Sequence, residues 1–201
     1  MSGDELLDVV DADGVRLASK PRRAVHRDGD WHVAFHLWVV SADGVLLQRR
    51  SMAKASWPGR LDATAAGHLL AGESVADGVR EAEEELGITY NFDDLVALGV
   101  HRVDETRDDG RINRELQHVF AARDDRPLEA YRQLDDRELD GLVLLEASVL
   151  RALAGGDPRE RHAIAWDGSR RRAITVGAGE LVPSPYLPRI ADDLARLGTG
   201  P

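Results

Sequence analysis

The stretch AAGHLLAGESVADGVREAEEELGI, residues 65–88, carries five glutamates within thirteen residues, just after a glycine-rich turn. Ser74 is a good helix N-cap, Asp77 completes a capping-box-like pair with it, and Gly87 is suited to the C-cap. We therefore predict a helix from about Ser74 to Leu86. Like charges on one helix face repel each other by roughly 0.3 kcal/mol per pair. The clustering of glutamates on this helix therefore calls for an explanation, such as a bound cation.

Helical spacing decides which of these glutamates act together. Glu81, Glu84 and Glu85 are spaced i, i+3 and i+4 and share one face, whereas Glu83 points away. Mg²⁺ and Mn²⁺ prefer hard oxygen ligands and commonly share them with water and phosphate oxygens. Arg80 can pair with Glu84 one turn later and orient it. The pattern favours a metal–diphosphate site, and the alternative is a solvated acidic face of the kind common on surface helices.

The apolar patterning around this helix predicts an α/β fold. Two hairpins precede the helix, two strands follow it, and then come a strand leading into a helix, a hairpin and a short amphipathic helix. This order predicts an α/β sandwich around a mixed sheet. The corresponding segments are residues 6–19, 32–50, 95–103, 114–123, 139–156, 162–176 and 184–197.

Residues 67–88 resemble the Nudix box, in which Gly, five residues, Glu and seven residues precede Arg-Glu-aliphatic-x-Glu-Glu-x-Gly-aliphatic. The resemblance implies the Nudix α/β/α sandwich with a central mixed β-sheet, and metal-dependent hydrolysis of a diphosphate. Only six residues, 74–79, separate Glu73 from Arg80, and one residue rotates an α-helix by ~100°. We expect the first turn to absorb that change. The matching residues are Gly67, Glu73, Arg80, Glu81, Ala82, Glu84, Glu85, Gly87 and Ile88.

The resemblance extends over roughly residues 5–155 to the Nudix branch that includes isopentenyl diphosphate isomerase. It implies that His26, His32 and His68 bind a metal together with Glu115, although Asn113 occupies a second glutamate position. Each histidine has an alternative role as a core or surface residue.

Ala66 stands where the isomerase has its catalytic cysteine, and the chain contains no cysteine. Isomerisation of an unactivated alkene needs a proton donor and a proton acceptor on opposite faces, and alanine is neither. The prediction is therefore a Nudix hydrolase acting on a small-molecule diphosphate, such as a nucleoside diphosphate derivative. The alternatives are an isomerase-like enzyme acting on prenyl diphosphates and a non-catalytic diphosphate sensor.

The loop QRRSMAKASWPGR, residues 48–60, concentrates basic side chains in an acidic protein. Arginine grips phosphate bidentately and lysine acts as a point charge, so Arg50, Lys54 and Arg60 are candidate substrate-binding residues. The isomerase resemblance implies that Arg50 and Lys54 hold the diphosphate. A solvated edge-strand cluster is the alternative, and Trp57 in the same loop either lines the pocket or packs.

The predicted reaction follows from these groups. Mg²⁺ or Mn²⁺ on the acidic helix would neutralise phosphate charge and lower the pKa of a bound water. Glu84 or Glu115 would accept the water's proton, and Arg80 would orient the metal carboxylates. The predicted metal ligands are Glu81, Glu84, Glu85, Glu115, His26, His32 and His68.

Composition sets the remaining expectations. The 201 residues include 26 Lys and Arg against 36 Asp and Glu, a formal net charge of −10 that argues against nucleic acid and anionic membranes. The absence of cysteine fits a cytoplasmic protein, and no segment has the ~20 apolar residues of a membrane helix. We expect a Nudix domain over residues 1–155. Residues 156–201 are expected to pack on it as a hairpin and a helix, with a homodimer contact as one possible use.

Overall fold

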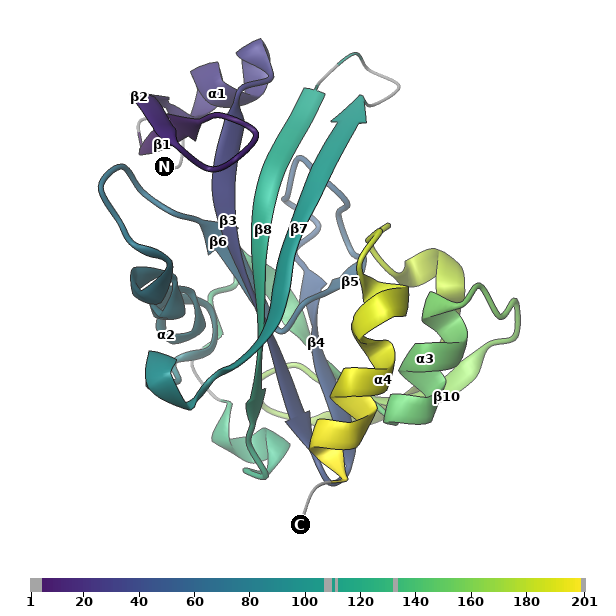
Figure 1. Cartoon of the computed structure of the whole chain (residues 1–201). Helices are drawn as coiled ribbons and strands as arrows, with labels where there is room; N and C mark the ends of the chain where they lie inside the picture. The colour runs from purple at the N-terminus through teal and green to yellow at the C-terminus, as the bar shows by residue number, and fades with distance from the viewer. Residues whose placement is uncertain (1–4, 107–109, 111, 132–133, 200–201) are drawn as a thin grey trace.

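One long apolar strand, β3 (Trp31–Ser41), organises the fold (Figure 1). This computed structural model describes residues 5–106, 110, 112–131 and 134–199. Strand β3 is flanked on one side by β8 (Ile112–Arg123), which runs parallel to it over Trp31–Val40. On the other side it pairs antiparallel with β6 (Ala65–His68) and, through its last three residues, with β4 (Gly44–Arg50).

The rest of the sheet extends from these strands. β7 (Val96–Thr106) pairs with β8, and β5 (Leu61–Asp62) pairs with β4. Three further strands continue beyond β4 in the order β9 (Leu139–Leu145), β10 (Arg161–Trp166) and β11 (Arg171–Val176). The hairpin of β1 (Leu6–Val10) and β2 (Arg16–Pro21) joins the start of β3. One parallel pair among antiparallel ones makes the sheet mixed.

Alternation along β3 builds a core on each face of the sheet. Phe35, Leu37 and Val39 pack with α2 (Arg80–Leu86), whereas Trp38 and Val40 pack under two other helices. Those helices are α3 (Ala147–Ala154) and α4 (Leu187–Gly198). Helices on both faces of a mixed sheet confirm the predicted α/β/α sandwich.

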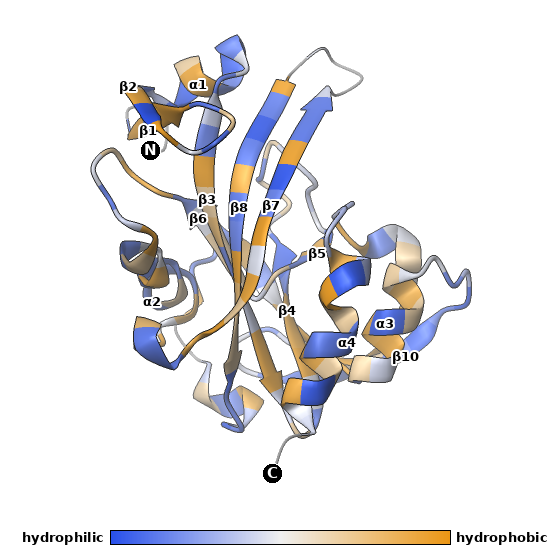
Figure 2. Cartoon of the chain, viewed as in Figure 1, coloured by the Kyte–Doolittle hydropathy of each residue, from blue (hydrophilic) through white to orange (hydrophobic). Residues whose placement is uncertain are grey.

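The C-terminal segment is integrated into this architecture. β10 continues the sheet from β9, and α4 contributes Ile190 and Leu194 to the core beside α3. Figure 2 shows α4 with alternating polar and apolar stretches, which is typical of an amphipathic helix lying on a core. The division at residue 155 remains a prediction. No helix in the described part of the chain has the length and apolar character needed to cross a bilayer.

Candidate active site

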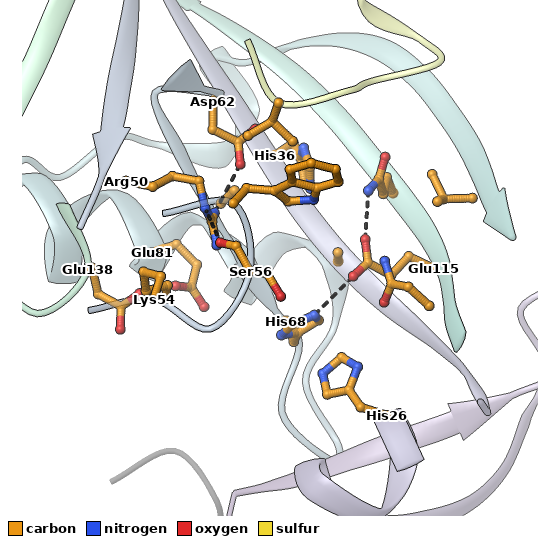
Figure 3. Close-up of a pocket in the computed structure, with 18 of the residues that line it drawn as sticks. His26, His36, Arg50, Lys54, Ser56, Asp62, His68, Glu81, Glu115 and Glu138 are labelled. Atoms are coloured by element: carbon orange, nitrogen blue, oxygen red, sulfur yellow. Dashed lines mark hydrogen bonds and ion pairs between the residues drawn. The ribbon is translucent and has the colours of Figure 1, made fainter. Parts of the chain in front are cut away.

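A cavity of about 820 Å³ lies beside β3 and β6 and gathers charged side chains from most of the chain (Figure 3). The helix α1 (Arg22–Asp28), helix α2, the loop 54–57 and the segment 182–186 all contribute to its lining. Carboxylates and cations therefore face a common space. The basic residues of the lining are Arg22, Arg23, Arg50, Lys54, Arg80 and Arg137.

Strand register brings three histidines and a glutamate together. His32 on β3 lies opposite Glu115 on β8, and His68 on β6 lies opposite Ala34, two residues along β3. Helix α1, which the sequence analysis missed, supplies His26. The three imidazole rings have centroids 4.8–5.1 Å apart, and one ring nitrogen from each lies within 4.8 Å of the others. The structure thus places four of the predicted metal ligands in one cluster.

The protonation states in this histidine cluster suit a metal ion. Burial lowers the pKa of His68 to about 3, so its imidazole is neutral at neutral pH. Burial opposes ionisation of Glu115, but the hydrogen bond to His68 holds the pKa of Glu115 well below its usual range. His68 Nε2 lies 3.2 Å from Glu115 Oε1, and Gln117 donates to Glu115 Oε2 at 2.6 Å. A carboxylate and neutral imidazoles are the forms that bind metal.

Two buried histidine nitrogens without hydrogen-bond partners among the described residues also indicate metal binding. A neutral His68 that donates from Nε2 to Glu115 carries an unprotonated Nδ1. His68 Nδ1 and His32 Nε2 are both buried, and neither has a hydrogen-bond partner among the described residues. Buried polar atoms are normally paired, so each such atom needs an explanation. The donor set of imidazole nitrogens and one carboxylate fits Mn²⁺ or Zn²⁺ in type.

Helix α2 brings a second group of carboxylates against β6. A Cβ at Gly67 would lie 2.1 Å from Glu81 Cδ, so glycine alone lets this carboxylate approach the strand. Glu85 accepts hydrogen bonds from the Ala66 N–H at 3.1 Å and from Gln48 Nε2 at 3.3 Å. Burial raises the pKa of Glu81 to about 7 and the pKa of Glu85 well above its usual range. A divalent cation would stabilise both ionised carboxylates.

Glu83 and Glu84 take different positions on α2, in line with the helical spacing. The Glu84 side chain is 59% exposed and lines the cavity. Glu83 is exposed outside the cavity lining. The face predicted for Glu81, Glu84 and Glu85 therefore turns toward the cavity, with Glu84 at its solvent side.

Arg80 ties the carboxylates of this region to one another. Its Nε and Nη2 donate to the two oxygens of Glu73 at 2.7 and 3.0 Å. Its Nη1 donates to Glu81 at 2.6 Å and to Glu84 at 3.2 Å, and Nη2 also reaches the carbonyl of His68 at 3.1 Å. The Glu73 pair raises the pKa of Arg80 further above its usual value. Arg80 therefore positions α2 carboxylates relative to β6.

The shortened part of the Nudix box forms a 3₁₀ helix. Residues Val75–Val79 form a 3₁₀ turn that leads directly into α2, where we predicted a continuous α-helix. Five residues at ~3.0 per turn rotate the chain by about 600°, the rotation of six α-helical residues. The rise along the helix axis is also similar, at about 10 Å for five 3₁₀ residues and about 9 Å for six α-helical residues. Glu73 and Arg80 consequently still meet despite the shorter spacing.

Two of the three predicted cations line the cavity. Arg50 donates from Nη1 to Asp62 at 3.0 Å and from Nε to the Ser56 carbonyl at 3.1 Å, which holds its guanidinium in place. Lys54 forms an ion pair with Glu138. Each cation is therefore held at the cavity by a carboxylate.

Arg60 is directed elsewhere. Its Nη1 donates to the Leu181 carbonyl at 3.1 Å, and its guanidinium lies 5.0 Å from the centroid of the Trp57 ring. Trp57 lines the cavity, whereas Arg60 is outside the lining. A role for Arg60 in substrate binding remains a prediction without a direct contact to support it.

The sequence alone did not identify the side chains that pair with the predicted site residues. Asp62 and Glu138 balance Arg50 and Lys54, and Gln48 bonds to Glu85. Glu138 lies 84 residues beyond Lys54, so only the tertiary fold brings the two together. The basic loop itself indicated that counterions must exist, because cations in a cavity require them. The sequence does not say which carboxylates provide them.

Comparison with known sequences defines the class of protein. A model of the NUDIX domain matches residues 30–167. An uncharacterized Nudix hydrolase of Clostridium acetobutylicum is 36% identical over 151 residues, 73% of this chain and 72% of the relative. An isopentenyl-diphosphate Delta-isomerase of Clavibacter sepedonicus is 36% identical over 121 residues, 59% of this chain and 63% of that protein. Nudix hydrolase 3 of Arabidopsis thaliana is 41% identical over 122 residues, 58% of this chain but 16% of that protein.

A solved structure shares the fold of this chain. The crystal structure of DR0079 from Deinococcus radiodurans covers 96% of this chain and 100% of its own, with a TM-score of 0.61 and 19% identity. At this identity the likeness shows a common fold. The match of the NUDIX domain over residues 30–167 and the relative of Clostridium acetobutylicum show that the chain belongs to the Nudix family.

Proposed function

We propose that this protein hydrolyses the diphosphate linkage of a small-molecule substrate with Mg²⁺ or Mn²⁺. The observation that carries the proposal is the meeting of two charged groups in one cavity. Glu81, Glu84 and Glu85 line it on one side, and Arg50 and Lys54 line it too. A diphosphate with its divalent ion presents negative oxygens to the cations and positive charge to the carboxylates. Relatives named as Nudix hydrolases support this class of reaction.

Two sets of residues are proposed to hold divalent ions. Glu81, Glu84 and Glu85 offer oxygen ligands, and the histidine cluster offers three imidazole nitrogens with the Glu115 carboxylate. A bound ion supplies neutralisation of phosphate charge and a lowered pKa for a coordinated water. Arg80 restrains Glu81 and Glu84 through its hydrogen bonds, so less reorganisation is needed when substrate binds.

Glu84 is the proposed acceptor for the proton of the attacking water. Both oxygens of Glu115 are engaged, one with His68 and the other with Gln117. Glu84 engages one oxygen with Arg80 and stands exposed at the cavity. A general base must reach the water, so the exposed carboxylate is the better placed of the two.

Arg50 and Lys54 are proposed to fix the phosphate away from the reacting bond. Asp62 and the Ser56 carbonyl hold two guanidinium nitrogens of Arg50, which leaves its Nη2 edge for phosphate. Lys54 adds a mobile point charge, because a lysine side chain adapts to several phosphate positions. Both residues therefore contribute to binding more than to proton transfer.

Isomerisation is the second candidate, because several relatives are named isopentenyl-diphosphate Delta-isomerase. Ala66 argues against it here. This residue pairs with His36 across β3 and β6, and its side chain has no proton to exchange. The histidine cluster is compatible with either reaction, so the assignment to hydrolysis rests on Ala66 and on the absence of cysteine.

A panel of diphosphates tests the proposal. Nucleoside diphosphate derivatives and prenyl diphosphates would be incubated with the protein and Mg²⁺ or Mn²⁺. Products would be followed by ³¹P NMR for cleavage and by ¹H NMR for double-bond migration. Cleavage that disappears after chelation of the metal supports the proposal. Migration without cleavage would establish the isomerase alternative, and binding without any product would establish a sensor.

A further inference from the structure

His36 stands on the cavity floor but belongs to none of the groups assigned above. It lies on β3 four residues after His32, which is about 13 Å along a strand. Ala34 separates the two histidines, and Ala66 lies directly opposite His36 on β6. These alanines are small, so the floor between His36 and the histidine cluster is open to a ligand. Both alanines and His36 line the cavity, as do His26 and His68 of the cluster, whereas His32 is deeply buried. Figure 3 labels the three histidines of the lining.

A buried tyrosine from the C-terminal segment holds His36 on one edge. His36 Nδ1 lies 2.8 Å from the hydroxyl of Tyr186. Trp38 donates from its indole N–H to the same hydroxyl at 3.3 Å. Trp38 and Tyr186 have 1% and 2% of their surface exposed. The hydroxyl therefore has no solvent to complete its hydrogen bonds.

These contacts determine which way the hydrogen bond runs. An indole N–H only donates, so it occupies a lone pair of the Tyr186 oxygen. The phenolic proton then needs an acceptor, because buried hydroxyl groups are rarely left unpaired. The Ser184 hydroxyl also interacts with this oxygen but has a proton of its own to donate, so His36 Nδ1, at 2.8 Å, is the acceptor. Tyr186 thus donates to Nδ1, and a neutral His36 carries its own proton on Nε2.

We propose that His36 donates a hydrogen bond from Nε2 to a phosphate oxygen of the substrate, and that Tyr186 positions it for this role. The proposal rests on the proposed diphosphate hydrolysis and adds a binding residue to it. Nδ1 is covered by the tyrosine, while His36 as a whole keeps 9% of its surface exposed and lines the cavity. Burial lowers the pKa of His36, which keeps the imidazole neutral and the tautomer defined.

The proposal also gives the C-terminal segment a task. Tyr186 lies outside residues 30–167, the part that matches the Nudix domain. The segment is anchored to the sheet by the bond from Val182 N–H to the Leu61 carbonyl at 2.8 Å. From there residues 182–186 line the cavity and place Tyr186 beneath β3. Residues beyond the matched region therefore complete the floor of the site.

Nitrogen NMR tests the tautomer without any need for activity. In ¹⁵N-labelled wild type we expect His36 to be the Nε2–H tautomer, and Tyr186→Phe to shift it toward Nδ1–H or a mixture. Inorganic diphosphate with Mg²⁺ should perturb the Nε2 signal. Nδ1–H in the wild type would overturn the proposal, as would an Nε2 signal unaffected by saturating diphosphate.

Kinetics test the function of the same contact on a diphosphate that the wild type cleaves. His36→Leu should raise KM about tenfold, as expected for one lost hydrogen bond to a charged group. His36→Gln, which retains a donor, should recover much of the loss, and the exposed His162→Gln serves as the control. Wild-type KM in His36→Leu, with the fold intact by circular dichroism, would contradict the proposal. Failure of the wild type to cleave any diphosphate would instead contradict the proposed function.

Discussion

Gly67 determines how closely a metal carboxylate approaches the sheet. The strand β6 passes so near Glu81 that even a methyl group at position 67 would overlap the carboxyl atoms at 2.1–2.2 Å. Glu81 is restrained on its other side by Arg80 at 2.6 Å. The carboxylate therefore has one place to lie, between the strand and the guanidinium.

Substitution of Gly67 by alanine should displace Glu81 and reduce hydrolysis at least about 100-fold, because small misplacements at a reacting centre are costly. The variant should remain folded, since the far end of a side chain moves. Gly179→Ala is the matched control, because a Cβ there meets nothing within 4 Å. Turnover of Gly67→Ala equal to that of the control would show that the position of Glu81 does not matter.

Local spacing explains which residue assignments could be made from sequence. The i, i+3, i+4 pattern of Glu81, Glu84 and Glu85 is a property of one helix, so it needed no tertiary information. Arg60 shows the limit, because it lies in the same basic loop as Lys54 but its side chain turns toward the Leu181 carbonyl. Charge clustering predicts a basic region, whereas the direction of each side chain depends on distant backbone.

The 3₁₀ turn of Val75–Val79 is the element that lets a shortened motif keep its geometry. Gly78 packs against Phe35 there, and a Cβ at this position would lie 2.7 Å from the ring. The tight turn and the glycine together bring the start of α2 onto the core. Compensation at the first turn stays a prediction, and the sequence did not predict the 3₁₀ form of this segment, because helix type there depends on packing as well as on spacing.

Insertion of one alanine after Ser74 tests this interpretation. Six residues in α conformation rotate the chain as far as five in 3₁₀ conformation, so the Glu73–Arg80 pair should survive. We expect hydrolysis within about threefold of wild type, since the reacting groups keep their places. Insertion of two alanines rotates α2 by a further ~100° and should abolish hydrolysis. An equal loss of hydrolysis in the two insertion variants would contradict the interpretation that the 3₁₀ turn sets the rotation of α2.

The strands show a different limit of prediction. The histidine cluster was predicted from a resemblance, not from spacing, because His32, His68 and Glu115 lie on three strands. Their meeting depends on the register of β3 with β6 and β8, and a shift of one residue would turn them to opposite faces. Short segments such as α1 and the four residues of β6 carry too weak a pattern to reveal that register.

At the scale of the whole molecule, the buried carboxylates link stability to pH and metal. The pKa of Glu81 is about 7 in the folded chain against 4.5 for an ordinary glutamate, and that of Glu85 is also raised. At these two carboxylates the folded state therefore holds more protons than the unfolded state between these values, so the stability that they contribute falls as pH rises through that window. The buried His68 acts in the opposite sense over part of the same window, because its pKa is about 3 in the folded chain against 6.5 for an ordinary histidine, so the stability that it contributes rises with pH.

Between pH ~5 and pH ~7.5, metal-free wild type should accordingly lose melting temperature relative to Glu81→Gln, which cannot titrate at this position. Mg²⁺ should raise the melting temperature more at the higher pH, because protons and metal compete for the carboxylates. Differential scanning fluorimetry across this range measures both effects. A difference in melting temperature between wild type and Glu81→Gln that does not change across this range would contradict the raised pKa assigned to Glu81.

The central claim is that the cavity face of α2 carries out metal-dependent cleavage of a diphosphate. The most direct test compares Glu84→Gln with Glu83→Gln, two neighbouring isosteric changes on one helix, of which only Glu84 lines the cavity. The measurement is the rate of product release with saturating Mg²⁺ on the best substrate of the diphosphate panel. We predict a loss of at least about 100-fold for Glu84→Gln and wild-type rates for Glu83→Gln. Equal rates for the two variants would contradict the claim.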